Sequence, residues 1–332
     1  MMTRGALLLT RSDIRRIATR EDYHDAVADG FRAFAAGRAR SPFPMEIPGE
    51  GGAFHIKGAS MTIRGRAFTA VKINGNFPAN SDAFKLPTIQ GVIILADATN
   101  GSPVAIIDST EITARRTAAA SAVATDILAK KASATLLICG CGVQAHAHLE
   151  AIAPLRDFRC VIAFDAAADR ADLFAATAKD MLKIPVTPVD DLISAAATSD
   201  VIVTLTTSKA PLPLADAVRP GTFIAAVGAD SPAKNEIPPV LMKRSAVVTD
   251  VTDQCAVMGD LRAAIDVGAM NRGDVRSELG QILIGAGKGR LTDEEILIFD
   301  STGAAFQDLT VAVMAAERAS KGGAGAWIDL QR

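Results

Sequence analysis

The sequence predicts a two-domain α/β protein, with a parallel sheet covered by helices on both faces and a separate α+β domain. Three observations lead to this prediction. A glycine-rich turn at 140–145 separates an apolar run from a helix-compatible segment. From there to residue 299, short apolar runs alternate with helical patterns, which is typical of a doubly wound parallel sheet. Before residue 109, helical patterns are followed by extended runs bounded by Gly, Asn or Pro, which favour an antiparallel sheet.

The glycine-rich turn has the pattern of a dinucleotide-binding site. The apolar run Leu136–Cys139 is followed directly by Gly140-Cys141-Gly142-Val143-Gln144-Ala145. In such a unit the first glycine permits the turn, the second lets the backbone approach a pyrophosphate, and the small last residue lets helix and strand pack closely. The phosphates then lie at the positive end of the helix dipole. The pattern predicts a Rossmann domain, and a glycine turn with only a structural role is the alternative.

An acidic residue in the right place indicates which dinucleotide binds. Cys160–Phe164 reads as the next strand, and Asp165 follows it, twenty positions after Ala145. A carboxylate there can accept both ribose hydroxyls of an adenosine, whereas it would repel a 2′-phosphate. The next three residues are alanines, so no arginine is at hand to bind that phosphate. We therefore expect NAD as the cofactor in preference to NADP.

The composition is that of an ordinary globular protein. The chain has 332 residues, of which 49% are hydrophobic and 22% charged, which is enough for two domains. A net charge of −2 and scattered basic residues argue against a nucleic-acid partner. No apolar run reaches the ~18 residues that a membrane span needs, and the apolar core near the N-terminus is shorter than the roughly seven residues of a signal peptide. We expect a cytoplasmic protein with no membrane partner.

The cysteines and histidines do not form a recognisable metal site. Cys139 and Cys141 are spaced C-x-C, which is not the C-x-x-C of redox or zinc pairs, and we expect all four cysteines to be reduced. His146 and His148 are two positions apart on one expected helix, so their side chains diverge. The sequence therefore predicts no bound metal.

The expected elements follow in chain order. The segment 1–11 reads as an edge strand or the approach to a helix, a helix starts at 10–13, and another spans Arg20–Gly37. The Asn100-Gly101 pair is a hairpin signal, and alanine-rich Ser109–Lys131 reads as one long helix. Strands are expected at Ala53–Ser60, Arg66–Ile73, Thr88–Ala96, Pro103–Ile107, Val186–Pro188, Val201–Leu205, Thr222–Val227, Ala246–Thr249 and Glu294–Phe299, and helices at Ala168–Leu182, Asp190–Ala197 and Gly303–Lys321.

These elements define two expected domains. Residues 116–303 form the Rossmann NAD-binding domain. Residues 1–115 form the second domain together with 304–332, because the last helix has an apolar face with no obvious partner in a complete nucleotide-binding fold.

Four blocks of sequence resemble those of the ornithine cyclodeaminase/mu-crystallin family, in the family's order. They are Ile112–Ala119, Gly140–Gln144, Val227–Lys234 and Phe299–Gly303. The family contains ornithine and lysine cyclodeaminases, archaeal-type alanine dehydrogenases and reductases of cyclic ketimines and related imino acids. The resemblance implies a homodimer, with the first domain binding the substrate and its antiparallel sheet forming the interface.

Asp230 is the expected acid/base residue. It follows an expected strand at the carboxyl edge of the parallel sheet, where folds of this kind bind ligands. A carboxylate beside a nicotinamide can exchange a proton with an amine or imine nitrogen. A turn or N-cap aspartate ahead of Ser231-Pro232 is the alternative. The resemblance assigns Asp230 the acid/base role, and mu-crystallin-like members lack an acid at this position.

Two basic residues are expected to hold the substrate. Lys72 lies inside an apolar strand, so it either faces solvent or meets an anion. By resemblance it contacts the substrate carboxylate and shares in catalysis, while Arg116 contacts both carboxylate and cofactor. The planar guanidinium of Arg116 suits that task, although a solvated helix arginine is the alternative.

One departure from the family concerns a third carboxylate-binding residue. Relatives commonly have an arginine where this chain has Pro44 or Met45, and Lys57 could replace it across the sheet. This departure leaves the size and charge of the substrate open.

The remaining site residues are implied by resemblance alone, since Ser and Thr at strand ends commonly form turns. Thr302 would contact the substrate. The expected cofactor contacts are Thr88, Arg116, Thr117, Gly140, Gly142, Val143, Gln144, Asp165, Thr206, Val227, Gly228, Lys234 and Ser301.

Three functions remain open at this stage. The leading one is an NAD(H)-dependent oxidoreductase that transfers hydride at the α-carbon of a small α-imino or α-amino acid. An ornithine cyclodeaminase-type lyase would use NAD catalytically, without consuming it. A non-catalytic mu-crystallin-like binding protein is disfavoured by Asp230. The sequence does not identify the substrate side chain, because the pocket residues are far apart in the chain.

Overall fold

The structure, a computed structural model, describes residues 5–179, 181–182 and 184–330. It divides into two compact units: unit 1 contains Met1–Arg116 and Ala304–Arg332, and unit 2 contains Thr117–Gly303. This division lies within one residue of the domain limits expected from the sequence.

Unit 1 is built on a mixed sheet in the order β16-β1-β7-β6-β5-β4-β2, with β3 also paired to β4. Strands β1 and β7 run parallel, and the other pairs are antiparallel. The strands are β1 (Ala6–Leu9), β2 (Ala39–Arg40), β3 (Met45–Gly49), β4 (Gly52–Ile63), β5 (Arg66–Asn76), β6 (Ile89–Asp97), β7 (Pro103–Asp108) and β16 (Ala326–Ile328).

The hairpin predicted at Asn100-Gly101 joins β6 to β7, and Gly101 has a φ of 77°. The position expected for the first strand needs a correction. Strand β1 lies between β7 and β16, so it is interior and β16 forms the edge in its place. Residues 1–4 of the expected N-terminal segment lie outside the described residues.

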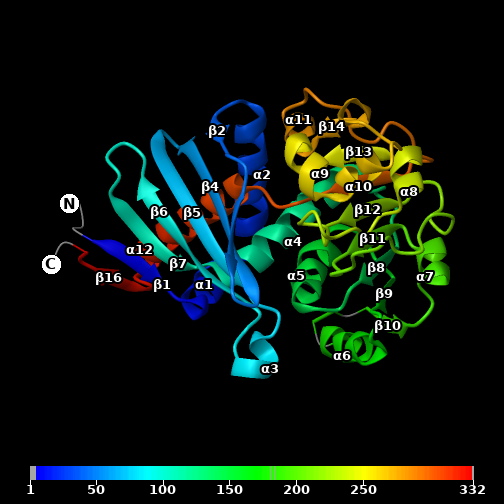
Figure 1. The fold of residues 1–332 in the computed structure, drawn as a ribbon, viewed down its shortest axis with the longest axis horizontal. Helices are drawn as coiled ribbons and strands as arrows, with labels where there is room; N and C mark the ends of the chain where they lie inside the picture. The colour runs from blue at the N-terminus through cyan, green and yellow to red at the C-terminus, as the bar shows by residue number, and fades with distance from the viewer. Residues whose placement is uncertain (1–4, 180, 183, 331–332) are drawn as a thin grey trace. The chain divides into compact units, whose positions relative to one another are not determined.

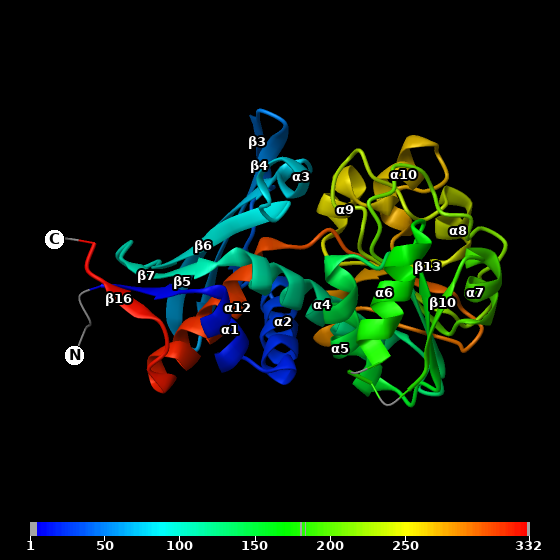
Figure 2. The same ribbon diagram turned by 90° about the horizontal axis from the view of Figure 1, so that it is seen from below.

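Three helices lie on one face of this sheet, as Figure 2 shows: α1 (Arg11–Ile17), α2 (Arg20–Ala35) and α12 (Ala305–Gly322). Thr10 and Thr19 cap α1 and α2 in reciprocal capping boxes, which accounts for both helix starts. Phe306 of α12 stacks on Phe34 and meets Phe31 edge-on, with ring centroids 4.8 and 5.2 Å apart. The chain's last helix therefore packs into the core of its first unit.

Two further helices begin in unit 1. The short helix α3 spans Asn80–Phe84. The predicted long helix is α4 (Ser109–Leu128), which begins in unit 1 and continues into unit 2.

Unit 2 contains an all-parallel sheet in the order β10-β9-β8-β11-β12-β15-β13-β14. The chain order reverses between β8 and β11, which is the switch point where doubly wound folds bind ligands. The strands are β8 (Thr135–Cys139), β9 (Cys160–Phe164), β10 (Val186–Val189), β11 (Val201–Thr204), β12 (Phe223–Ala226), β13 (Ala246–Thr249), β14 (Ser277–Glu278) and β15 (Leu297–Asp300).

Helices cover both faces of this sheet, with α5 and α6 on one side and α7 on the other (Figures 1 and 2). Every residue of β11, β12 and β15 is buried, which explains why these strands read as continuous apolar runs. Helix α6 is described to Lys179, and residue 180 of the expected helix lies outside the described part. The helices are α5 (Val143–Ile152), α6 (Ala168–Lys179), α7 (Leu192–Thr198), α8 (Pro239–Arg244), α9 (Thr252–Met258), α10 (Asp260–Asp266) and α11 (Leu279–Leu283).

Within the described residues, no helix combines the length and apolar character needed to cross a membrane. The α/β fold class predicted from the sequence, with a Rossmann unit and an α+β unit, is confirmed.

Candidate functional site

The glycine-rich turn joins β8 to α5 at the switch point of unit 2. Gly140 has a φ of 98°, and a Cβ there would lie 2.9 Å from the carbonyl carbon of Leu205, so only glycine fits. Gly142 is the residue before the first turn of α5, and a Cβ at this position would meet nothing within 4 Å. Val143 is 84% exposed. The turn therefore leaves open space over the helix N-terminus, as a bound pyrophosphate requires.

Asp165 lies beside this turn. One carboxylate oxygen accepts a hydrogen bond from the Cys141 N–H at 2.8 Å, and the other accepts one from the Ala167 N–H at 3.0 Å. The end of β9 and the glycine turn are thus held together by one acid. The position and chemistry of Asp165 fit an acceptor for adenosine ribose hydroxyls.

A buried acid that was not singled out from the sequence, Glu236, organises the next two strand ends. One of its carboxylate oxygens accepts from the N–H and hydroxyl of Thr206 at 2.6 and 2.7 Å. The other accepts from the Thr204 hydroxyl at 2.6 Å and the Gly228 N–H at 2.8 Å. Glu236 therefore fixes two of the expected cofactor contacts, Thr206 and Gly228.

Further buried acids continue from Glu236. Asp260 accepts the N–H groups of Glu236 and Ile237 at 2.7 and 2.9 Å, and Asp300 accepts the N–H of Leu261 at 2.8 Å. Burial raises the pKa of Glu236, and burial together with the charge of Glu236 raises the pKa of Asp260 to about 7. Burial and Asp260 likewise raise the pKa of Asp300 far above its ordinary value. We call Glu236, Asp260 and Asp300 the acid ladder.

Asp230 lies on an exposed segment after β12. Its side chain is 54% exposed, and it accepts a hydrogen bond from the Lys234 ammonium at 2.6 Å. Two residues of the expected site are thus paired within unit 2. Val227, between β12 and Asp230, is buried.

Ser301 and Thr302 follow β15 and are both buried. The Ser301 hydroxyl and the Thr302 N–H donate to Asp250 at 3.2 and 2.9 Å, and the Gln254 amide donates to the Thr302 hydroxyl at 2.7 Å. Internal hydrogen bonds therefore hold both side chains in unit 2. Thr117 is also buried, on α4.

Unit 1 contains a buried cluster of opposite charges. The Lys72 ammonium lies 2.9 and 2.8 Å from the two carboxylate oxygens of Asp308, and the Arg116 Nε donates to the first of these oxygens at 2.9 Å. The Arg116 guanidinium also donates to the Gln307 side-chain oxygen at 2.8 Å. The side chains of Lys72, Arg116 and Asp308 are 4%, 5% and 3% exposed. We call these three residues the anchor cluster.

The anchor cluster shifts the pKa of its members in opposite ways. Burial, together with the charges of Arg116 and Lys57, lowers the pKa of Lys72 to about 7, although Asp308 opposes the shift. Burial alone would raise the pKa of Asp308, but Arg116 and Lys72 outweigh it and hold this pKa below its ordinary value. The alternative in which Lys72 faces solvent is therefore wrong, because Lys72 points inward and meets an anion.

Lys57 belongs to the same neighbourhood. It pairs directly with Lys72 across the β4–β5 ladder, so both side chains stand on one face of the sheet. Lys57 is half-buried and its charge acts on both Lys72 and Asp308. Met45, at the place of the family's arginine, lies on β3 and is 53% exposed. Thr88 precedes β6, and its carbonyl accepts from the Phe77 N–H at 2.9 Å.

Asp308 was missed in the sequence, although one signal could have found it. It is the sole ionisable residue in the stretch Ala305–Ala316, the mostly apolar first two-thirds of α12. A buried acid at such a place needs a cation.

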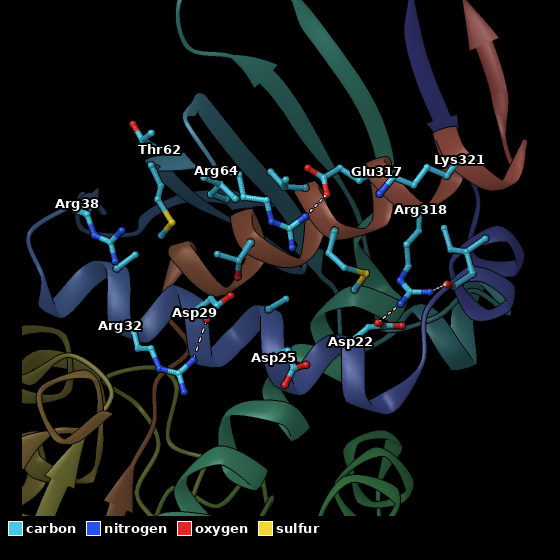
Figure 3. Close-up of a pocket in the computed structure, with 18 of the residues that line it drawn as sticks. Asp22, Asp25, Asp29, Arg32, Arg38, Thr62, Arg64, Glu317, Arg318 and Lys321 are labelled. Atoms are coloured by element: carbon cyan, nitrogen blue, oxygen red, sulfur yellow. Dashed lines mark hydrogen bonds and ion pairs between the residues drawn. The ribbon is translucent and has the colours of Figure 1, made fainter. Parts of the chain in front are cut away.

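A cavity in unit 1 contains none of the expected site residues. It has a volume of about 910 Å³ and lies between α2, α12 and the end of β4 (Figure 3). Ion pairs line it, including Arg64–Glu317 and Arg32–Asp29 at 2.9 Å and a close Arg318–Asp22 pair. Because the protein neutralises these charges itself, they single out no ligand.

The four cysteines are free thiols. Burial, with Asp165 nearby, raises the pKa of Cys141 to about 12, so this thiol beside the glycine turn stays protonated. In the described residues, no three or more His, Cys, Asp or Glu side chains are arranged to hold a metal ion.

Comparisons with known proteins match nearly the whole length of the chain to one family. Residues 5–323 match the ornithine cyclodeaminase/mu-crystallin family. An alanine dehydrogenase of Archaeoglobus fulgidus is 33% identical over 98% of this chain and 99% of its own length.

Two solved structures show the same architecture. One is an archaeal alanine dehydrogenase dimer with bound NAD, which superimposes with a TM-score of 0.93 at 33% identity and covers 98% of this chain and 99% of its own. The other is the pyrroline-2-carboxylate reductase of Thermococcus litoralis in complex with NADH and L-proline, with a TM-score of 0.92, 30% identity and coverage of 97% and 100%. Both the match along the sequence and the shared fold identify the chain as a member of the ornithine cyclodeaminase/mu-crystallin family.

Proposed function

We propose that the protein is an NAD(H)-dependent oxidoreductase that acts on a small α-imino or α-amino acid. The observation that carries the proposal is the anchor cluster, in which two buried cations share one acid. A buried cation pair of this kind suits a carboxylate ligand. Support comes from the relatives named as an alanine dehydrogenase and a pyrroline-2-carboxylate reductase.

Unit 2 would hold the dinucleotide. The open turn at Gly140 and Gly142 and the start of α5, with Val143 and Gln144, would receive the pyrophosphate. Asp165 would accept the ribose hydroxyls, which favours NAD over NADP. Thr206, Val227, Gly228, Lys234 and Ser301 would complete the contacts in unit 2, together with Thr88, Arg116 and Thr117. When bound, the nicotinamide would supply or accept the hydride at the substrate α-carbon.

Unit 1 would hold the substrate by its carboxylate. Lys72 and Arg116 would donate charge-assisted hydrogen bonds, with Lys57 adding positive charge to the same sheet face. Thr302 is proposed as a further substrate contact. Fixing the carboxylate restricts the position of the α-carbon, which is the main requirement for hydride transfer.

Asp230 would exchange the proton at the substrate nitrogen. Its carboxylate is exposed and bonded to Lys234, so it can gain and lose a proton without opening a buried network. This exposure favours Asp230 as the acid/base residue over the buried acids of unit 2.

The first experiment follows NADH absorbance with pyruvate plus ammonia and with pyrroline-2-carboxylate. Oxidation of NADH by either supports the proposal, and slower oxidation of NADPH supports the cofactor preference. Ammonia release from ornithine without net change in NADH would instead identify the cyclodeaminase reaction. NADH binding without turnover of these compounds would identify a binding protein.

The second experiment replaces Asp230 by Asn. We expect kcat to fall by roughly 100-fold or more, since a positioned acid/base group contributes about that much, while NADH affinity is retained. Asp216→Asn, at another exposed position of unit 2, is the matched control and should retain full activity. Full turnover by Asp230→Asn would exclude the acid/base role.

A homodimer through the sheet of unit 1 is also proposed. The side of β6 opposite its buried Ile93 and Leu95 presents Val92 and Ile94, both 39% exposed. A neighbouring exposed apolar residue, Phe54, lies on β4. An apolar sheet face of this kind suits a second copy of the chain. Sedimentation analysis tests the proposal, and a monomer at micromolar concentration would contradict it.

A further inference from the structure

We propose that Asp308 is a positioning residue of the substrate site, which holds Lys72 and Arg116 in place and keeps Lys72 able to carry the charge that binds a carboxylate. The inference rests on the proposed function, because that function assigns the two cations to the substrate. Asp308 itself would not touch the reacting atoms.

The geometry gives Asp308 control over both cations. Lys72 comes from β5, Arg116 from α4 and Asp308 from α12. Both Asp308 oxygens lie within 2.9 Å of the Lys72 ammonium, and one of them also accepts from Arg116. The Asp308 carboxylate therefore links β5, α4 and α12. It fixes the positions of the Lys72 ammonium and the Arg116 guanidinium.

Donor capacity leaves room for a ligand. An ammonium has three N–H donors and a guanidinium five, whereas a carboxylate has only two oxygens. The Lys72 ammonium already faces three acceptors, the two Asp308 oxygens and the Thr113 hydroxyl. The Arg116 guanidinium donates only to Asp308 and Gln307 among the described residues, so it keeps further donors for a ligand. A substrate carboxylate can then join the cluster without displacing Asp308.

The charges around Lys72 make Asp308 the residue that sustains its protonation. Arg116 on α4 and Lys57 on β4 both disfavour a charged Lys72, and burial acts in the same direction. Asp308 on α12 opposes all three, while the neighbouring Thr113 and Asn74 are neutral. Without the acid, burial and two like charges would act on Lys72 with nothing to oppose them.

The first test measures the protonation of Lys72 in the substrate-free protein. NMR of the lysine side-chain nitrogens, assigned with Lys72→Arg, follows the Lys72 signal against pH. Wild type should titrate near pH 7. Asp308→Asn should move the midpoint down by about one unit or more, and Asp308→Glu should keep it near that of wild type.

The matched control is Glu317→Gln on the same helix. Glu317 pairs with Arg64 at 2.9 Å and lies outside the anchor cluster. This control should leave the Lys72 titration unchanged. Equal midpoints for Asp308→Asn and Glu317→Gln would overturn the inference.

The second test measures kinetics against pH with pyrroline-2-carboxylate and NADH. Asp308→Asn should raise KM by roughly tenfold or more above about pH 7, where the variant's Lys72 is neutral, and should change kcat less. The KM values of variant and wild type should approach each other only below about pH 5, at least a unit under the variant's midpoint, where Lys72 becomes protonated in both. Asp308→Glu should restore part of the affinity.

The outcomes separate the inference from the proposed function. A wild type that turns over while Asp308→Asn raises KM by the same factor at every pH would reduce Asp308 to a structural role. A wild type without turnover of any candidate substrate would overturn the proposed function, and with it the positioning role.

Discussion

The anchor cluster of unit 1 and the acid ladder of unit 2 bury carboxylates equally deeply but stabilise them in opposite ways. Asp308 meets two cations, and its pKa falls although burial alone would raise it. Glu236, Asp260 and Asp300 accept mainly backbone N–H groups, and burial raises their pKa values. Burial has the same effect in both places, so the partner decides whether the acid stays charged.

This difference separates a site that can bind an ion from one that holds backbone in place. The anchor cluster retains positive charge after Asp308 is counted, so it can attract an anion. The acid ladder joins the ends of β11 and β12 and the start of α10 through hydrogen bonds. Its acids therefore serve best as clamps for the loops that follow β11 and β12.

Matched acid-to-amide substitutions test this contrast most directly. Asp308→Asn removes the only acid of the anchor cluster from two buried cations, and we expect a loss of about 3–5 kcal/mol in the free energy of unfolding. Asp260→Asn should change this free energy by less than about 1 kcal/mol near pH 7, because Asn keeps the acceptor that holds Glu236 and Ile237. Urea unfolding measures both. Equal losses would show that the two clusters do not differ.

The dependence of stability on pH is the second test. The pKa of Asp260 is raised in the fold to about 7, so its contribution is complete below its unfolded value near 3.8 and is lost as pH rises towards 7. We expect wild type to lose roughly 2–4 kcal/mol over this window through Asp260 and its coupled neighbour Glu236. In Asp260→Asn this decline should be smaller. Unfolding curves from about pH 4 to pH 7 give the slope, and an unchanged slope would contradict the assignment.

His148 gives the smallest expected change in stability. Its partners carry no charge, so its pKa shift reports burial without a neighbouring ion. Its ring is buried and bonded to the Gln144 carbonyl and the Ser121 hydroxyl, and burial lowers its pKa to about 4. Its contribution is complete above its unfolded pKa of 6.5 and is lost as pH falls through 4. We expect a loss of about 1–3 kcal/mol at pH 4.

His148→Gln should lack this part of the acid-induced loss. His24→Gln, at a partly exposed position, is the control and should retain the acid-induced loss. If both variants lose stability equally on acidification, another group causes the loss.

Local sequence patterns predicted the longer helices and most strands of both sheets, because continuous apolar runs and helix caps leave clear local signals. They did not predict the short elements α3, α8, α9, α10, α11, β2, β3, β14 and β16. Continuous apolar runs marked β8 and β11, and capping residues such as Thr10 marked helix starts. The interior place of β1 was not predicted, because β16 comes from the other end of the chain and is only three residues long.

Only part of the candidate site was predicted, again because residues that interact in the fold lie far apart in the sequence. Lys72 could be recognised as a charged residue in an apolar strand, but its partner Asp308 lies 236 positions away. Glu236 was missed because nothing near it in sequence shows that it receives hydrogen bonds from two strand ends. Asp230 was identified by resemblance, and its role remains a prediction.

The late position of α12 has a consequence for synthesis on the ribosome. Unit 2 is continuous in the chain, so it can fold while the nascent chain is still growing. Unit 1 cannot, since Lys72 and Arg116 are made long before the helix that carries their counter-charge. A chain that stalls before residue 304 would expose two cations and an uncovered sheet, which makes this intermediate a natural target for chaperones.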